Sequence, residues 1–331
     1  MSRFLCPGLA AVVAAMLVTT VAAASGHQVR VGVLKFGTVH WELDVIQTHK
    51  LAERQGIDLQ VVKFGSKRAT SVALQGGGAD VIVTDWIWVS RQRAEGRDYA
   101  FAPYSLSVGA LMVRPDSGIA ELADLAGRKV GIAGGPVDKS WLLLQAYAKR
   151  GGLDLAAAVE PTFGAPPLLN ELMQRGDLPA VLNFWHYNAR LKAAGMKELL
   201  PAVEILPALG VDRPVPLLGW VFNRSWANEN RDAVAGFLRA SYSAKHLLLE
   251  SDEEWKRLEP MMKVSDATTA AALRDAYRLG IPRRFGEADR EAAARAFAIL
   301  AAEGGEKLVG ASDTLDPGTF WTEFDPARWR Q

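Results

Sequence analysis

The sequence predicts an α/β protein with two lobes, each built on a mostly parallel β-sheet that is flanked by helices. Three observations predict this fold class. Short apolar segments alternate with amphipathic helical patterns from residue 29 to residue 222, as in successive βαβ units. A turn-rich break at 114–118 divides the pattern into two series. The chain has 331 residues, of which 49% are apolar and 23% charged, and this suffices for two soluble globular domains.

The first series occupies residues 25–113. Its strands are short runs of apolar and β-branched residues, and its helices show apolar positions at helical spacing. Ser66 is a favourable N-cap for the second helix, which the triple glycine at 76–78 ends. We expect strands at 29–34, 58–63, 80–84, 99–102 and 106–113, and helices at 41–55, from 66 to the triple glycine, and at 86–94.

The second series begins after the break, with a tight turn at Gly127 and a buried strand that leads into a Gly-Gly-Pro loop. We expect strands at 129–133, 159–163 and 180–184, an extended segment at 203–207, and helices at 138–150, 166–174 and 185–194. A last apolar strand at 215–222 follows. The sequence therefore predicts a second lobe, 114–207, inserted into a first lobe made of 25–113 and 208–331, with two crossings that act as a hinge.

The C-terminal part is predicted to be helical at 230–249, 253–262, 267–279 and 287–302, because apolar residues recur there at helical spacing. These helices carry no recognisable motif. We expect them to pack against the first lobe.

The N-terminus, residues 1–24, has the features of a secretory signal peptide. Arg3 is followed by an uncharged apolar run at 9–21 and by the small residues Ala22–Ala24. The run is shorter than the roughly 20 residues that a membrane span needs, although an uncleaved anchor remains the alternative. Cys6 is the only cysteine and lies before the run, so the mature chain is expected to have neither a disulfide nor a catalytic thiol.

Composition narrows the classes of function. Lys and Arg number 38 against 37 Asp and Glu, so the net charge of +1 indicates no nucleic-acid or anionic-membrane partner. Neither a Gly-x-Ser-x-Gly nor a His-Glu-x-x-His motif is present. Ten Trp residues are many for this length, and we expect several of them to line a site.

Three internal segments resemble one family. Leu-Ala-Asp-Leu-Ala-Gly-Arg-Lys-Val-Gly-Ile at 122–132 resembles the "DLKGKKVGV" segment of periplasmic solute-binding proteins of ABC importers, in particular the nitrate, sulfonate, taurine and thiamine-precursor group. The segment at 75–81 is similar to the family's "G-x-x-D" turn, and 172–180 to its "L-x-x-G-x-x-D-A" segment, with Pro179 where an acidic residue is usual. With the signal peptide, the resemblance covers nearly the whole mature chain.

The resemblance implies a type II periplasmic-binding fold in which two lobes close by hinge motion around one solute. It implies a periplasmic monomer that passes its solute to a membrane permease and its ATPase. It implies no catalysis, no cofactor and no metal.

The cleft contacts expected from the first lobe lie in the loops after its strands, because ligands bind at the carboxyl ends of strands in open α/β sheets. They are Thr38, Trp41, Glu42, Ser66, Asp85, Trp86 and Tyr104. For several of them a structural role is the alternative. Ser66 and Asp85 are good N-caps, and Glu42 stands near a helix N-terminus, where a negative charge is favourable.

The contacts expected from the inserted lobe are Gly135, Asp138, Ser140, Trp141, Trp185 and His186. For His186, a structural hydrogen bond is the alternative. Aromatic rings stack on planar groups and attract cations, whereas helix N-termini hold anionic oxygens. The combination suits a small organic solute that contains a ring or an amine, or an organic sulfonate or carboxylate.

Three other functions remain open from the sequence. Glu42, Asp44, Asp85 and Asp138 could supply oxygen ligands to a hard metal ion or a metal chelate. The thiamine-pyrimidine synthases look like the same fold, so enzyme activity is an alternative function for this protein. A binding lobe that signals to a membrane sensor is the third.

Overall fold

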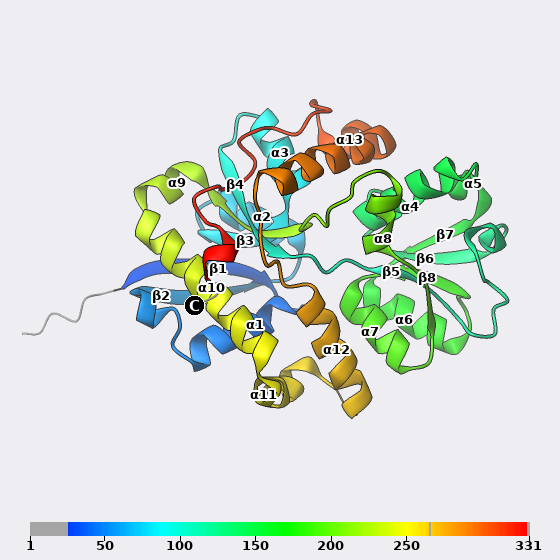
Figure 1. Ribbon diagram of the computed structural model, residues 1–331, viewed down its shortest axis with the longest axis horizontal. Coiled ribbons are helices and arrows are strands. Elements are labelled where there is room, and N and C mark those ends of the chain that lie inside the picture. Colours follow the sequence, from blue (N-terminus) through cyan, green and yellow to red (C-terminus); the bar gives the residue numbers. More distant parts are fainter. Residues whose placement is uncertain (1–25, 265, 330–331) are drawn as a thin grey trace, which may run out of the picture.

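The computed structural model describes residues 26–264 and 266–329 (Figure 1). The predicted signal peptide at 1–24 lies outside the described residues. The chain forms two five-stranded sheets with helices against their faces, which confirms the predicted two-lobed α/β class. Within the described part of the chain, none of the helices combines the length and the apolar content that a membrane span requires.

The first sheet has the strand order β2-β1-β3-β10-β4. Its strands are β1 (His27–Leu34), β2 (Ile57–Phe64), β3 (Val81–Asp85), β4 (Tyr99–Ser105) and β10 (Leu218–Asn223). β1 is parallel to β2 and β3, whereas β10 is antiparallel to both β3 and β4. The sheet is therefore parallel except for β10, the strand that returns from the second sheet.

The second sheet has the order β7-β6-β8-β5-β9. Its strands are β5 (Ala110–Val113), β6 (Lys129–Ala133), β7 (Glu160–Gly164), β8 (Ala180–Asn183) and β9 (Lys197–Pro201). β6 is parallel to β7 and β8, and β5 is antiparallel to β8 and β9. In both sheets, the one reversed strand is the first that follows a crossing between the lobes.

Helices lie on both faces of each sheet. Those associated with the first sheet are α1 (Val39–Thr48), α2 (Lys67–Gln75), α3 (Trp86–Ala94), α9 (Arg224–Glu229), α10 (Arg231–Glu250), α11 (Asp252–Met262), α12 (Ala267–Leu279) and α13 (Glu287–Val309). Those of the second are α4 (Lys139–Arg150), α5 (Leu155–Ala158), α6 (Pro166–Arg175), α7 (Trp185–Ala193) and α8 (Ala202–Ala208). Short 3-10 turns occur at Glu53–Gln55, Leu122–Leu125 and Pro326–Trp329.

The alternation of side chains along the strands divides the core into layers. In β10, Trp220 and Phe222 pack toward α1 and α10, whereas Val221 packs toward α3 and α13. In β5, Leu111 belongs to the layer under α4 and α8, and Met112 to the layer under α6 and α7. Successive residues of a strand point to opposite faces, so an apolar run of this kind is typical of a strand that is covered on both sides.

Two expectations about the second lobe need correction. The strand expected at 106–113 was counted with the first lobe, but β5 pairs with β8 and β9, so the crossing is at 106–109. The extended segment expected at 203–207 is α8, because Ala202 and Ile205 bury one helical face against the second sheet. The division of the chain into two lobes remains our proposal, with the first crossing moved to 106–109.

The two lobes touch on both sides of the crossings. Figure 1 shows α12 beside α7 on one side and α13 near α4 on the other. Ala189 of α7 is buried in the core layer of the first sheet that contains α1, and Leu142 of α4 is buried in the opposite layer. The structure is therefore a closed arrangement of the lobes.

Candidate functional site

An ion pair joins the two lobes at the ends of their strands. Asp85 is the last residue of β3, and Lys139 is the first residue of α4, just after the loop that follows β6. The Lys139 Nζ lies 2.9 Å from Asp85 Oδ2, and the two side chains are 21% and 9% exposed. Asp85 also accepts a hydrogen bond from the Trp88 N–H at 2.9 Å, so it caps α3 as the alternative reading predicted.

Each charge of this pair stabilises the other. Burial raises the pKa of Asp85, but the charge of Lys139 and its hydrogen bond outweigh burial and hold that pKa below its ordinary value. Burial alone would lower the pKa of Lys139, but the charge of Asp85 and its hydrogen bond outweigh burial, so that pKa is raised above its ordinary value. The carboxylate therefore contributes stability that is present above about pH 3.9, the ordinary value, and is lost as the pH falls through its lowered pKa.

Asp138, the N-cap residue of α4, fixes the shape of the loop that precedes this helix. Asp138 Oδ1 accepts hydrogen bonds from the N–H groups of Ser140 at 3.0 Å and Trp141 at 3.2 Å. Gly134 has a φ of +87°, and a Cβ there would lie 2.5 Å from Asp138 Oδ2. Only glycine fits this close approach with a positive φ. Burial raises the pKa of Asp138, and the nearby charge of Lys139 partly offsets that effect.

A second contact between the lobes involves Lys67 and Phe184. The Lys67 ammonium, in the first turn of α2, lies 5.8 Å from the centre of the Phe184 ring, next to the start of α7. Ser66 accepts the Ala69 N–H at 3.2 Å and so caps α2, again the alternative role. Thr38 precedes α1 without a side-chain capping bond. Phe184 precedes α7 in the same way, so the first N–H groups of both helices lack a side-chain cap.

Trp185 connects the lobes through aromatic contacts. Its ring lies 6.0 Å from that of Trp41 at 88° and 6.2 Å from that of Tyr277. Beside it, His186 Nδ1 has no hydrogen-bond partner within the described residues. Burial and the nearby Arg190 lower the pKa of His186 to about 4, so its imidazole is neutral at pH 7.

Four expected contacts lie inside the packed lobes and not on an open wall. They are Trp41, Glu42, Tyr104 and Trp141, which are at most 4% exposed. Trp41 packs on Trp255 and Tyr277 as well as on Trp185, and Trp141 packs in the core of the second lobe. These four side chains therefore contact other residues of the protein and not an open cleft.

Glu42 is the most consequential of these corrections. It is fully buried and forms an ion pair with Lys245 of α10. It also accepts hydrogen bonds from Ser241 at 2.5 Å and from Tyr277 at 2.9 Å. The Lys245 ammonium lies 3.8 Å from the centre of the Tyr104 ring, a cation-π contact. Lys245 was not predicted from the sequence. Its burial could have been inferred from its position on the apolar face of α10, three residues after Tyr242 and three before Leu248.

The indole ring of Trp86 is buried, which we did not expect for a residue at a helix start that faces the cleft. It is 1% exposed and its ring packs against Phe297 and Phe320. We expected Trp86 to contact a solute in the cleft, and the structure shows that its ring is covered, because α13 and the C-terminal segment supply apolar partners. Its Nε1 is nevertheless without a hydrogen-bond partner in the described part of the chain.

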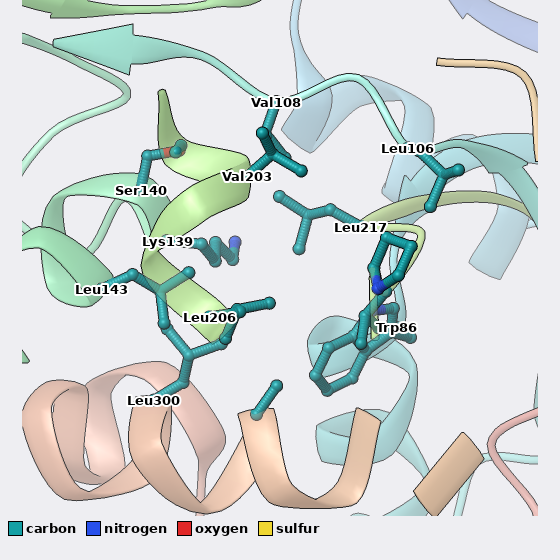
Figure 2. A pocket seen from close by; sticks show the side chains of 14 residues that line it. Trp86, Leu106, Val108, Lys139, Ser140, Leu143, Val203, Leu206, Leu217 and Leu300 are labelled. Atoms are coloured by element: carbon teal, nitrogen blue, oxygen red, sulfur yellow. The ribbon is translucent and has the colours of Figure 1, made fainter. Parts of the chain in front are cut away.

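Trp86 borders a cavity between the lobes, the interlobe cavity (Figure 2). Figure 2 shows Trp86 and Leu217 across the space from Lys139 and Leu206. The walls come from both lobes and both crossings, and the volume is about 40 Å³. The lining residues are Trp86, Leu106, Val108, Lys139, Ser140, Leu143, Ala202, Val203, Leu206, Pro214, Val215, Leu217, Ala296 and Leu300.

A family model described as NMT1/THI5 like matches residues 52–254, more than half of the chain. The chain belongs to this family. No curated protein sequence matches the chain. The resemblance inferred from the sequence segments is thereby confirmed at the level of the family and its fold.

Solved structures with a similar fold include periplasmic binding proteins. The aliphatic sulphonate binding protein SsuA from Escherichia coli has a TM-score of 0.69 at 21% identity, over 88% of this chain and 96% of that one. The alkanesulfonate-binding SsuA from Xanthomonas axonopodis pv. citri, bound to MOPS, has a TM-score of 0.69 at 18% identity, over 90% and 99%. The nitrate-binding protein NrtA from Synechocystis PCC 6803 has a TM-score of 0.56 at 12% identity, over 90% and 76%. These neighbours place the chain in the two-lobed periplasmic-binding fold.

In this family member, the carboxylates considered for a hard metal are not brought together. Glu42 pairs with Lys245, Asp44 with Arg257 and Asp85 with Lys139, and Asp138 caps α4. Across 26–264 and 266–329, no group of three or more His, Cys, Asp or Glu residues could hold a metal ion.

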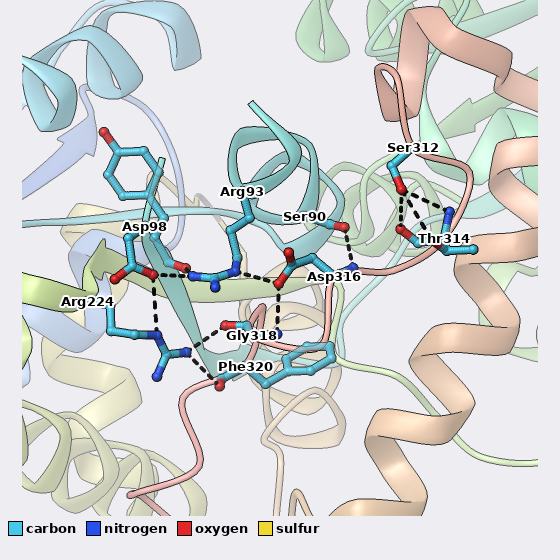
Figure 3. A network of polar contacts seen from close by, with 10 residues as sticks. Ser90, Arg93, Asp98, Arg224, Ser312, Thr314, Asp316, Gly318 and Phe320 are labelled. Atoms are coloured by element: carbon cyan, nitrogen blue, oxygen red, sulfur yellow. Dashed lines mark hydrogen bonds and ion pairs between the residues drawn. The ribbon is translucent and has the colours of Figure 1, made fainter. Parts of the chain in front are cut away.

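A second polar network in the first lobe has a structural role (Figure 3). Arg93 of α3 binds Asp316 at 2.6 Å and pairs with Asp98. Arg224 donates to the carbonyl oxygens of Gly318 at 2.6 Å and Phe320 at 3.2 Å. The network fastens the C-terminal segment, whose Phe320 packs against the Trp86 ring.

Proposed function

We propose that the protein is the solute-binding component of an ABC-type importer, which captures a small organic solute between its two lobes and delivers it to a permease. The observation that carries the proposal is the Asp85–Lys139 ion pair, since it joins the strand ends of the two sheets across a closed cleft. Membership in a family whose structural neighbours are binding proteins supports it. The proposal involves no chemical reaction.

The solute site that we propose is formed by the loops on both sides of this ion pair. It comprises Thr38, Ser66, Asp85, Trp86, Gly135, Asp138, Ser140, Trp185 and His186. Lys67 and Phe184 belong with them because they form the second contact across the cleft. The buried residues of the two lobes support this site by fixing the elements that carry it. They are Trp41, Glu42, Tyr104 and Trp141.

We infer that the solute contains a ring or an amine, or is an organic sulfonate or carboxylate. The Trp185 and Phe184 rings offer stacking surfaces. The first N–H groups of α1 and α7, which lack a side-chain cap, offer hydrogen bonds to oxygen atoms. Closure of the lobes excludes water and strengthens each of these contacts.

We place the protein in the periplasm as a monomer that docks on a membrane permease with its ATPase. The apolar run at 9–21 and the periplasmic origin of the structural neighbours support this placement.

The direct test is a thermal-shift screen with sulfonates, carboxylates, amines, pyrimidines, amino acids and metal ions. A ligand that binds only the folded protein is expected to raise its stability by about 2.7 kcal/mol at a concentration 100-fold above the Kd. We expect one of the organic classes to raise Tm in a concentration-dependent way. If no class raises Tm, the binding role is contradicted.

The ion pair makes a separate prediction about closure. In a Cys6→Ser background, spin labels on Val72→Cys of α2 and Phe163→Cys of β7 report the separation of the lobes, since both sites are exposed. Lys139→Met is expected to shift the measured distances to longer values, because it leaves the buried carboxylate of Asp85 unpaired. Lys139→Arg keeps the charge and is the control. Equal distances in both variants would show that the pair does not hold the lobes together.

A further inference from the structure

Arg190 donates hydrogen bonds from one lobe to the other. It lies on α7, and its Nη2 donates to the Met262 carbonyl oxygen at 2.6 Å, while its Nη1 donates more weakly to that of Lys263 at 3.4 Å. Met262 is the last residue of α11, and Lys263 is its C-cap, with a φ of +54°. A guanidinium from a helix of the second sheet therefore caps a helix of the first.

The end of α11 needs such a donor. The last carbonyl oxygens of a helix have no partner within the helix, and the helix dipole makes a cation favourable there. Among the described residues, no group other than Arg190 donates to the Met262 or the Lys263 carbonyl oxygen. Hydrogen bonds from a charged donor are stronger than those between neutral groups. Separation of the lobes would exchange this contact for weaker hydrogen bonds to water.

The contact lies far from the hinge. The Leu106 N–H donates to the Gly280 carbonyl oxygen at 2.8 Å, so the end of α12 is attached to the first crossing. The 13 residues of α12 lead about 20 Å away from that attachment, at 1.5 Å per residue, and α11 ends shortly before α12 begins. Figure 1 shows α12 running from the crossings toward α11, with α7 beside it.

This distance makes the contact sensitive to opening. A rotation of about 10° around an axis that lies at the crossings and runs across α12 displaces a point about 20 Å away by about 3.5 Å. A displacement of that size is more than a hydrogen bond tolerates. The hydrogen bonds of Arg190 are therefore expected to exist only in the closed arrangement.

Arg190 is the directional contact on this side of the molecule. In the described part of the chain, no other hydrogen bond joins α7 to α11 or α12. The other contacts are apolar, since Ala189 is buried in the core of the first lobe and the Trp185 ring packs against Tyr277. Apolar contacts are non-directional. A polar groove of about 410 Å³, which both lobes line, adjoins Arg190.

We infer that Arg190 and the two carbonyl oxygens at the end of α11 form a latch, the α11 latch, which holds the lobes closed from a position outside the solute cleft. Loss of the latch shifts the protein toward an open arrangement. It also lowers the apparent affinity for a solute in proportion to the closed fraction that is lost. The inference goes beyond the proposed function, because the latch acts in the protein without solute.

The test measures the separation of the lobes in the purified protein without added solute. Spin labels on Val72→Cys and Phe163→Cys in the Cys6→Ser background report it by double electron–electron resonance. Arg190→Met removes the donors and keeps an unbranched side chain. Arg190→Gln is a second variant, polar but too short to reach both carbonyl oxygens, and it keeps the test valid if Arg190→Met does not fold.

Two matched controls accompany these variants. Arg175→Met removes an arginine of the same lobe that is 62% exposed and pairs with Glu171 and Asp177 of that lobe. Lys263→Gly removes a side chain at the latch but keeps the carbonyl acceptor, and glycine suits the positive φ of this residue. Far-UV circular dichroism of each variant checks that it is folded.

Arg190→Met and Arg190→Gln are each expected to raise the ratio of open to closed protein about tenfold, with an unchanged circular dichroism spectrum. Both controls are expected to keep the distances of the parent protein. Each substitution is also measured in the Lys139→Met background, where the closed arrangement has lost its ion pair and a shift toward the open arrangement is easier to detect.

Two results would overturn the latch. One is a distance distribution that neither Arg190 variant changes, alone or with Lys139→Met. The other is an equal opening by Arg175→Met or Lys263→Gly, which would show that the cap on the α11 carbonyl oxygens is not the cause. Either result leaves the proposed function standing, whereas a thermal-shift screen without a ligand would contradict the function and leave the latch in place.

Discussion

Replacement of Lys245 by methionine is expected to lower the free energy of unfolding by about 3–5 kcal/mol. The substitution leaves the Glu42 carboxylate fully buried with only the hydroxyl groups of Ser241 and Tyr277 to stabilise it. It also removes the cation above the Tyr104 ring. Urea denaturation measures the effect, and a lower midpoint with an unchanged slope would show a loss of stability in the native state.

Two variants make the Lys245 prediction specific. Glu42→Met combined with Lys245→Met is expected to recover most of the loss, because replacement of both members of a buried pair by apolar residues is often neutral. Lys256→Met is the matched control, since Lys256 is exposed and paired at 4.0 Å with exposed Glu253. The control should change the stability by less than about 0.5 kcal/mol. A Lys245→Met effect as small as that of Lys256→Met would contradict a stabilising role for the buried pair.

Gly109→Ala is expected to destabilise the protein by at least about 3 kcal/mol. A Cβ at this position would lie 1.8 Å from the Asn183 carbonyl oxygen and 2.9 Å from its carbon, and these backbone atoms have no rotamer into which to move. Gly109 immediately precedes β5, and Ala110 is paired with Asn183, so β5 would have to separate from β8 at the end of the crossing. Thermal and urea denaturation, followed by circular dichroism, measure the loss.

Gly65→Ala is the control for that substitution. A Cβ on Gly65 meets no atom within 4 Å, and its φ lies outside the left-handed region. The change is expected to be neutral or to stabilise by about 0.4–1 kcal/mol, because it restricts the unfolded chain. Equal stabilities for the two alanine variants would show that β5 and β8 tolerate a wider spacing at the crossing.

Local rules predicted the parts of the fold and the site that depend on neighbouring residues. The alternation of strands and helices indicated two α/β lobes, and the structure contains two sheets of five strands each. Ser66 and Asp85 were recognised as good N-caps, and each accepts the backbone N–H of the residue three positions on. Capping depends on a few consecutive residues, so the sequence contains all the information that it needs.

The sequence did not predict what depends on partners far along the chain. The run at 106–113 reads as one strand because its apolar residues are continuous, but its hydrogen-bond partners in β8 and β9 decide which sheet it joins. The burial of the Trp86 ring was not predicted, because Phe297 and Phe320, which cover it, come from the far end of the chain. The pairing of Asp85 with Lys139 depends on closure of the lobes, which no local pattern contains.

The position of β10 between β3 and β4 has a consequence for the order of folding during synthesis. All strands of the second sheet lie between residues 110 and 201, so that sheet has its full set of strands as soon as β9 has left the ribosome. Four strands of the first sheet, β1 to β4, are synthesised first, but the sheet lacks its interior strand β10 until residues 218–223 emerge. Until then β3 and β4 present unpaired edges, which are sites for aggregation and for chaperone binding. The half of the molecule that is made first is therefore the half that is finished last.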